Sequence, residues 1–246
     1  MSAPVRQRLL ALGCGAACHG AFLAAIATMA RGLLTGMATG WGSLHGAAAV
    51  AADGLLLLQF PILHSLLLTR RGTRVLGALG PAGVGRTLAS TTYVLLASLQ
   101  VGATFLWWSP SGIVLWRPTG PLLGAHLLAF AASWAFLARA LCDAGLGLQT
   151  GWLGWTAVWR GSTPRYPDLP RGGLFARCRQ PIYLGFALVL WTAPVWTPDR
   201  LAIAIAWGLY CAVGPLHKER RFATLYGRDF EDYRRRVPYL VPRLFP

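Results

Sequence analysis

Charged side chains are scarce in this chain of 246 residues, and acidic side chains are especially scarce. There are 8 Asp and Glu against 23 Lys and Arg; all charged residues together make up 13% of the chain, and hydrophobic residues make up 55%. A soluble globular domain contains about 25% charged residues. The composition therefore excludes an ordinary soluble globule and indicates an integral membrane protein.

Other features are also missing, and each absence removes a class of function. The few cysteines lie mostly in or beside apolar runs, without the spacing of a disulfide framework or of a C-x-x-C-H haem site. They are Cys14, Cys18, Cys142, Cys178 and Cys211. No metal site is expected, and neither the paired carboxylates of a hydrolase nor a Ser-His-Asp arrangement can be found by spacing. The stretch "GLGLQTG" does not have the spacing of a nucleotide-binding fingerprint.

The formal net charge of +15 is carried by residues between long apolar segments. This distribution is typical of side chains that set membrane topology and contact anionic lipid head groups. We therefore expect the lipid bilayer as the partner, with no nucleic acid and no obligate protein partner. Arg6 and Arg8 precede an apolar run at 9–30, which is longer than the apolar region of a signal peptide and predicts a retained first helix.

About 20 apolar residues are needed to cross the hydrocarbon core. Four such spans are predicted, at about 9–30, 46–68, 87–108 and 121–142. A fifth apolar region at 182–213 is interrupted by "TPDR" (197–200), which favours two short helices joined by a turn. A single re-entrant or broken helix is the alternative. The expected fold is an all-α integral membrane protein with five to six transmembrane segments, a C-terminal helical hairpin and a cytoplasmic amphipathic tail helix.

The basic residues predict the orientation of the chain, because cytoplasmic loops carry the excess of Lys and Arg. With the N-terminus inside, only Arg31, Arg117 and Arg200 lie outside, so both termini are expected in the cytoplasm. One domain is expected over the whole chain. Its parts are the first helix and outer loop (1–45), helices two to four (46–142), a cytoplasmic loop (143–180), the hairpin (181–214) and a cytoplasmic ligand-binding tail (215–246).

The start of the hairpin combines basic side chains with a helix terminus. Pro181 suits the first turn of a helix, where its missing N–H is not needed. Helix N-termini attract anions, and Arg177 and Arg179 just before this one strengthen that preference. The segment therefore suits a ligand with a carboxylate or phosphate beside an apolar wall. The same arginines are also ordinary topology signals, and this alternative stays open.

In the tail, Glu219 and a series of apolar and aromatic residues recur every three or four positions, which predicts an amphipathic helix. The positions are Glu219, Phe222, Tyr226, Phe230, Tyr233 and Val237. A carboxylate such as Glu219 can accept hydrogen bonds from a ribose diol, and aromatic rings can stack on a base or a cation. The two segments together suit a ligand with anionic, cationic and nucleoside parts, such as S-adenosylmethionine. The alternative is an interfacial anchor.

The motifs and their order resemble the membrane methyltransferases related to isoprenylcysteine carboxyl methyltransferase. That family's pattern is R-H-P-x-Y-x-G, then E-E-R-x-L, F-G-x-x-Y-x-x-Y and V-P; here the matching stretches are 179–185 and 218–238. Upstream, "FPILHSLLLTRRG", "STTYVLLASL" and "CDAGLGLQTGW" are similar to the methanethiol S-methyltransferase branch and its NnrU-type relatives. The resemblance covers about 55–242.

The resemblance implies an S-adenosylmethionine-dependent methyltransferase of a bacterial inner membrane, acting on a small thiol such as methanethiol or another lipophilic substrate. The implied cofactor-binding residues are Arg179, Gln180, Pro181, Tyr183, Gly185, Glu219, Arg220, Tyr226 and Tyr233. On the substrate side the candidates are His64, Ser65 and Gln149, with Asp143 as a weaker one. No catalytic residue is assigned. A histidine in such a position more often makes an ordinary hydrogen bond between helices, and this alternative stays open for His64.

Two residues depart from the family pattern. Gln180 replaces the family's histidine and cannot become a cation, and Lys218 replaces the first acid of the E-E pair. Three functions remain open: S-methylation of a small thiol, carboxyl methylation of an isoprenylated cysteine, and a non-catalytic role like that of NnrU-type proteins.

Overall fold

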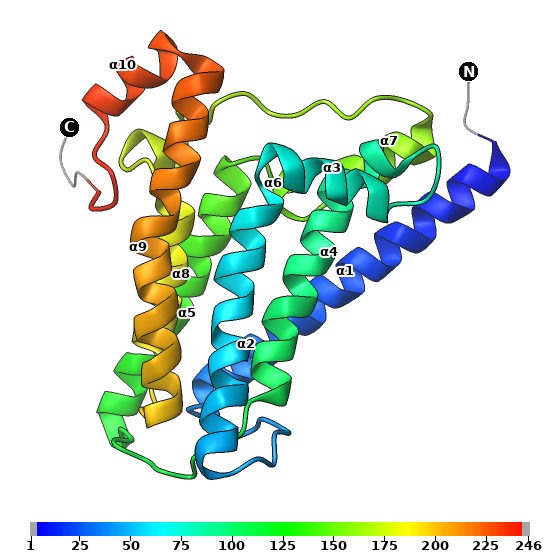
Figure 1. Cartoon of the computed structure of the whole chain (residues 1–246). Coiled ribbons are helices and arrows are strands. Elements are labelled where there is room, and N and C mark those ends of the chain that lie inside the picture. The colour runs from blue at the N-terminus through cyan, green and yellow to red at the C-terminus, as the bar shows by residue number, and fades with distance from the viewer. Residues whose placement is uncertain (1–3, 243–246) are drawn as a thin grey trace. The chain divides into compact units, whose positions relative to one another are not determined.

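The structure is a computed structural model that describes residues 4–242 (Figure 1). Residues 1–3 and 243–246, at the ends of the first and last predicted segments, lie outside the described residues. The helices are α1 (Val5–Leu34), α2 (Gly46–Leu67), α3 (Arg70–Leu79), α4 (Gly85–Trp107), α5 (Gly120–Asp143), α6 (Leu146–Gln149), α7 (Trp152–Arg160), the 3-10 helix η1 (Gly173–Ala176), α8 (Pro181–Thr192), α9 (Pro198–Tyr226) and α10 (Arg228–Arg236). Within the described residues there is no β-strand beyond one isolated bridge, so the all-α prediction is confirmed.

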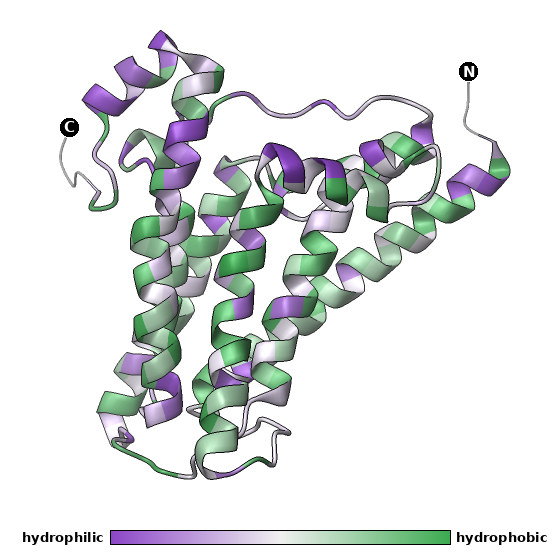
Figure 2. Ribbon diagram, viewed as in Figure 1, coloured by the Kyte–Doolittle hydropathy of each residue, from purple (hydrophilic) through white to green (hydrophobic). Residues whose placement is uncertain are grey.

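Within residues 4–242, five helices are long and apolar enough to cross a membrane: α1, α2, α4, α5 and α9. Figure 2 shows apolar residues along most of their length. The four spans predicted first agree with α1, α2, α4 and α5 to within a few residues at each end. In contrast, α8 has 12 residues, about 18 Å of helix at 1.5 Å per residue, which is too short to cross the hydrocarbon core alone.

The chain forms two compact units. Unit 1 comprises the residues up to Gly32 together with 39–110 and 146–166, and unit 2 comprises 33–38, 111–145 and the residues from Pro167 on.

Neutral hydrogen bonds link the helices of unit 1. In α2, Gln59 Nε2 donates to Gln100 O at 2.8 Å and to Thr104 Oγ1 at 3.1 Å, both in α4. Gln100 Nε2 donates back to Gln59 O at 3.2 Å. Reciprocal hydrogen bonds from side-chain amides satisfy polar groups inside apolar helices without introducing charge.

Unit 1 also contains a helix that the sequence did not predict, in the stretch between the predicted spans 46–68 and 87–108. The helix α3 begins at Thr69, whose Oγ1 accepts a hydrogen bond from Gly72 N at 3.1 Å, an N-cap. Gly72 lies so close to Leu66 that a Cβ atom would be 2.2 Å from the Leu66 carbonyl oxygen. The glycine therefore allows α3 to turn back sharply against the end of α2.

In unit 2, α8 packs against both α5 and α9. At Gly185 a Cβ atom would be 3.0 Å from Leu137 Cα, so the glycine allows α8 to approach α5 closely. Thr197 caps α9 by accepting a hydrogen bond from Arg200 N at 3.0 Å. The two helices and the turn between them form the predicted C-terminal hairpin.

Two details of the hairpin were not predicted. Arg200, which was counted among the basic residues outside the cytoplasm, is 0% exposed inside the turn. The amphipathic repeat of the tail does not form one helix: α9 continues unbroken to Tyr226, and the tail helix is the shorter α10. The break is at Gly227, whose φ of 52° and ψ of −125° are accessible to glycine and strained for other residues.

Candidate functional site

A buried ion pair joins the start of α8 to the last turns of α9. Arg179 Nε donates to Glu219 Oε1 at 2.8 Å, and Arg179 Nη2 donates to Glu219 Oε2 at 3.1 Å. The two side chains are 10% and 8% exposed. A bidentate guanidinium–carboxylate pair is strong and directional, and it fixes the two motifs against each other.

Arg179 also donates to carbonyl groups in the last turn of α10 and just after it. Arg179 Nη1 donates to Val237 O at 2.6 Å and to Arg234 O at 3.0 Å, and Arg179 N donates to Pro238 O at 2.9 Å. The V-P motif therefore acts here through its carbonyl oxygens. Tyr239 follows, with its ring centroid 5.6 Å from the guanidinium carbon.

The two departures from the family pattern touch each other. Gln180 Nε2 donates to Glu219 Oε1 at 2.8 Å, and Gln180 Oε1 accepts from Lys218 Nζ at 3.2 Å. Glu219 thus accepts three hydrogen bonds, and the lysine is linked to the carboxylate through the amide. Because each replacement bonds the other, the pair forms one connected network with Arg179.

Aromatic rings surround this polar network. Tyr233 donates its hydroxyl to Phe175 O at 2.7 Å, which joins α10 to η1. Burial raises the pKa of Tyr233 above its ordinary value, so the phenol stays a neutral donor. A cavity of about 10 Å³, roughly room for one water, lies among these groups. Its lining comprises Leu169, Pro170, Phe175, Arg179, Gln180, Lys218, Phe222, Phe230 and Tyr233.

The remaining predicted cofactor residues lie at differing places around the network. Pro181 is buried at the first turn of α8, and the Tyr183 ring is edge-on to Tyr210 at 6.4 Å. Tyr226 packs edge-on against Phe222 at 5.4 Å. Arg220 is exposed, and Gly185 is in contact with α5, as described above. The structure therefore brings together Arg179, Gln180, Glu219 and Tyr233, with Tyr183 nearby across Lys218.

The substrate-side candidates His64, Ser65 and Gln149 belong to unit 1. His64 Nε2 lies 2.7 Å from Tyr93 Oη, a hydrogen bond between α2 and α4, and Ser65 is the next residue of α2. Gln149 ends the four-residue helix α6. These contacts support helix packing, and the role of the three residues in substrate binding stays a prediction.

Asp143, the weaker candidate, belongs to unit 2 and holds η1 in place. Its Oδ2 accepts from Leu174 N at 2.8 Å, and its Oδ1 accepts from Arg139 Nε at 2.9 Å. A Cβ atom at Gly173 would be 2.2 Å from the Asp143 carboxylate, and the φ of Gly173 is +59°. Asp143 therefore acts on the site through η1, which presents Phe175.

Sequence reasoning missed Phe175, Leu169 and Tyr239. Phe175 and Leu169 lie in the Gly- and Pro-rich stretch between α7 and α8, where no periodicity marks a buried position. Tyr239 lies just beyond the last motif and donates its hydroxyl to Ala212 O at 2.8 Å. For Phe175, the one signal in the sequence was an aromatic residue within a stretch rich in Gly and Pro.

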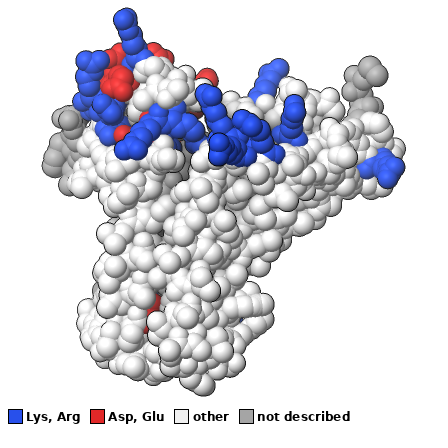
Figure 3. Space-filling model, in the orientation of Figure 1, with Lys and Arg blue, Asp and Glu red and all other residues white. Residues whose placement is uncertain are grey.

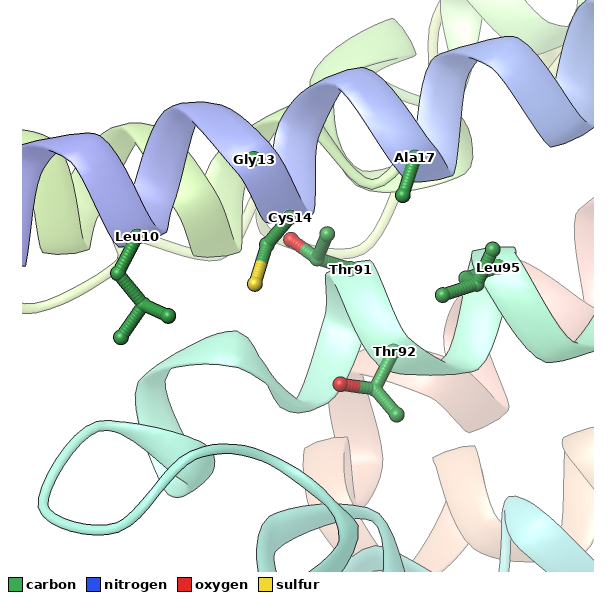
Figure 4. Close-up of a pocket in the computed structure, with 7 residues that line it drawn as sticks. All are labelled: Leu10, Gly13, Cys14, Ala17, Thr91, Thr92 and Leu95. Carbon is green, nitrogen blue, oxygen red and sulfur yellow. The ribbon is translucent and has the colours of Figure 1, made fainter.

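A larger cavity, of about 300 Å³, lies between α1 and α4 in unit 1 (Figure 4). Its lining is apolar apart from a thiol and two hydroxyls and comprises Leu10, Gly13, Cys14, Ala17, Thr91, Thr92 and Leu95. Thr91 Oγ1 already donates to Gly151 O at 2.7 Å. None of these seven residues is charged, so the cavity lacks partners for a charged ligand.

Comparison with known proteins finds relatives that are named as methyltransferases, and one with another name. The chain is 32% identical over 203 residues to "Methanethiol S-methyltransferase 2" of Bradyrhizobium diazoefficiens, covering 80% of this chain and 74% of that protein. "Methanethiol S-methyltransferase 1" of the same organism is 31% identical over 203 residues, with 80% and 68% covered. "Nurim" of Xenopus laevis is 29% identical over 178 residues, with 67% and 59% covered. No family model and no solved structure matches the chain.

Proposed function

The chain belongs to the methanethiol S-methyltransferase family of membrane methyltransferases, and on that basis we propose that it transfers a methyl group from S-adenosylmethionine to a small thiol such as methanethiol. The observation that carries the proposal is the network of Arg179, Glu219, Gln180 and Lys218 beside aromatic rings at one end of α8 and α9.

The side chains of this end suit the chemical groups of the donor. S-adenosylmethionine would supply an electrophilic methyl group on a positively charged sulfur. A thiolate would attack the methyl carbon in line, and the bond from that carbon to the sulfonium sulfur would break, so that the neutral thioether S-adenosylhomocysteine leaves. Aromatic faces attract a sulfonium, the Glu219 carboxylate accepts hydrogen bonds from hydroxyls, and the Arg179 guanidinium binds a carboxylate. The cavity of about 10 Å³ is too small for a nucleoside, so we expect donor binding to open the site.

The surroundings also suit a thiol acceptor, which reacts as its thiolate. Figure 3 shows basic side chains gathered over α10 and the adjoining end of α9. They include Arg220, Arg221, Arg228, Arg234, Arg235 and Arg236. Positive charge favours the deprotonated form of a nearby thiol, and the apolar helices exclude water from the reacting groups.

The location and partners form part of the proposal. We infer an inner-membrane protein of a bacterium with both termini in the cytoplasm, bound to the lipid bilayer and requiring neither nucleic acid nor an obligate protein partner. The basic side chains over α10 support a cytoplasmic C-terminal end. A reporter that is active on one side of the membrane, fused after the last residue, tests this orientation.

The test of activity is binding and turnover by the purified protein in detergent. S-adenosylmethionine is expected to bind, and methanethiol is expected to yield dimethyl sulfide in the headspace. Glu219→Gln should weaken donor binding about 10- to 100-fold, the effect of one or two charge-assisted hydrogen bonds. Asp232→Asn is the matched control, because Asp232 is an exposed acid paired with Arg235 on α10. Donor binding that is equal in both variants would contradict the assignment.

Two observations favour a non-catalytic alternative: the closed cavity and the charge reversal at Lys218. Under that alternative, donor binding is absent from the wild-type protein. Carboxyl methylation of an isoprenylated cysteine is separated by the acceptor assay, in which a farnesylated cysteine derivative would be methylated and methanethiol would not.

A further inference from the structure

The single lysine of the chain lies among three aromatic rings of unit 2. Lys218 Nζ is 5.9 Å from the centroid of the Phe175 ring, 5.7 Å from that of Tyr183 and 5.3 Å from that of Phe222. These distances are within the range of cation–π attraction. The rings come from η1, α8 and α9, so three separate elements converge on one ammonium group.

The charge of Lys218 is held without a direct carboxylate partner among the described residues. Its neighbour Glu219 already accepts three hydrogen bonds from Arg179 and Gln180. The ammonium instead donates to Gln180 Oε1 at 3.2 Å. Ring faces and one amide oxygen therefore stabilise this cation, a set of groups that suits onium ions generally.

We propose that the rings of Phe175, Tyr183 and Phe222 form the binding site for the positively charged sulfur of the methyl donor, and that the Lys218 ammonium occupies this site in the ligand-free protein. The three rings are called the onium cage below. The identity of the incoming cation as a sulfonium rests on the proposed function, whereas the cage and its occupant come from the contacts above.

Two positive charges cannot share the cage, because they repel each other and compete for the same ring faces. Donor binding therefore requires the flexible lysine side chain to leave, which also frees Gln180 Oε1. The neighbouring cavity of about 10 Å³ has room for roughly one water, and departure of the ammonium and its side chain enlarges it. Lys218 thus sets the selectivity of the site by opposing cationic ligands more than neutral ones of the same shape.

The sole lysine allows a direct experiment, since an amine-reactive acylating reagent has one side-chain target in the full-length protein. The rate of Lys218 acylation is measured by peptide mass spectrometry in detergent, with trimethylsulfonium, S-adenosylmethionine or its neutral thioether product S-adenosylhomocysteine. Both sulfonium compounds are expected to raise the rate at least fivefold, and the thioether is expected to leave it nearly unchanged. An unchanged or reduced rate at saturating sulfonium overturns the proposal.

The two sulfonium compounds separate this inference from the proposed function. Faster acylation with trimethylsulfonium, without binding of S-adenosylmethionine, would support the onium cage and refute the methyltransferase proposal. Binding of S-adenosylmethionine, with no faster acylation of Lys218 in the presence of either sulfonium compound, would refute the cage and leave the methyltransferase proposal intact.

Substitutions give a second, independent measurement. Lys218→Met removes the charge and keeps a similar length, so it should tighten binding of S-adenosylmethionine about tenfold relative to S-adenosylhomocysteine. Lys218→Arg keeps the charge and should preserve the wild-type ratio of the two affinities. Arg228→Gln, which removes an exposed charge at the start of α10, is the control for net charge. An unchanged or reduced ratio in Lys218→Met would overturn the proposal.

Discussion

Two buried arginines lie at opposite ends of the α8–α9 hairpin, and their partners differ. Arg200, in the turn, donates to Leu190 O and Val195 O, both at 2.9 Å, and its guanidinium carbon is 3.8 Å from the centroid of the Trp196 ring. Arg179, at the other end, pairs with the Glu219 carboxylate and with backbone carbonyls of the last segment.

The difference separates an arginine held by fixed backbone groups from one in the proposed binding site. The carbonyls that Arg200 binds lie in the last turn of α8 and just after it, where carbonyl groups lack helical partners and the helix dipole is negative. Arg200 therefore completes the turn with backbone groups that cannot leave. Arg179 holds side chains and a terminal segment, and each of these can exchange its hydrogen bonds for those of a ligand.

Breaking the ion pair at the Arg179 end is expected to have the largest effect. Arg179→Met leaves the Glu219 carboxylate buried beside Gln180 and should lower the free energy of unfolding by about 3–5 kcal/mol. Chemical unfolding in detergent measures the change.

The double variant Arg179→Met with Glu219→Leu is its control. Because it removes both charges together, it should recover most of the stability and still fail to bind the methyl donor. A double variant as unstable as Arg179→Met alone would mean that Arg179 stabilises the fold chiefly through the carbonyls of Val237 and Arg234.

A smaller loss is expected at the turn. Arg200→Met leaves the carbonyls of Leu190 and Val195 buried without their donor and removes the contact with Trp196, which should cost about 2–3 kcal/mol. The donor affinity of the folded protein should stay unchanged, as measured by calorimetry. Weaker donor binding in folded Arg200→Met would contradict the division of roles between the two ends.

The sequence predicted most of this hairpin but only part of its charged end. Span lengths and the "TPDR" interruption were sufficient for the helices, because they depend on hydropathy and chain length. The proximity of Arg179 and Glu219, 40 residues apart, followed from placing both motifs at one end of the same hairpin, but their direct ion pair was not predicted. Phe175 could not be predicted, since it reaches the site through η1, which a distant residue, Asp143, holds in place.

The burial of Arg200 was also missed, for a physical reason. Charge counting treats each arginine at a helix boundary as exposed to water, and its partners here are backbone carbonyls, which every sequence contains. The split of the tail at Gly227 escaped detection because the aromatic repeat continues in phase across the break. Periodicity reports which residues share a face, and it does not report whether the backbone between them is continuous.

Gly185 lies between the two ends of the hairpin, and its role can be tested. The family resemblance assigns it to cofactor binding, whereas the structure places it against α5. Gly185→Ala brings a Cβ atom to 3.0 Å from Leu137 Cα and should lower the free energy of unfolding by about 1–2 kcal/mol through overpacking. Gly172→Ala is the control, because nothing lies within 4 Å of its added Cβ. Reduced donor affinity in Gly185→Ala at full stability would favour the cofactor role.

The smallest predicted effect concerns pH, and it follows from two tyrosines at the Arg179 end, Tyr239 and Tyr233. Burial, and then the charge of Glu219, raises the pKa of Tyr239 to about 12. A raised pKa means that folding favours the protonated phenol, so this contribution to stability is complete below about pH 10 and is lost as the pH rises through about 12. Tyr239→Phe should therefore remove part of the alkaline decline in stability, seen in unfolding curves and in tyrosinate absorbance. Because the pKa of Tyr233 is raised as well, some of the decline should persist in this variant. A stability profile at alkaline pH identical to that of the wild type would show that Tyr239 ionises without weakening its attachment to α9.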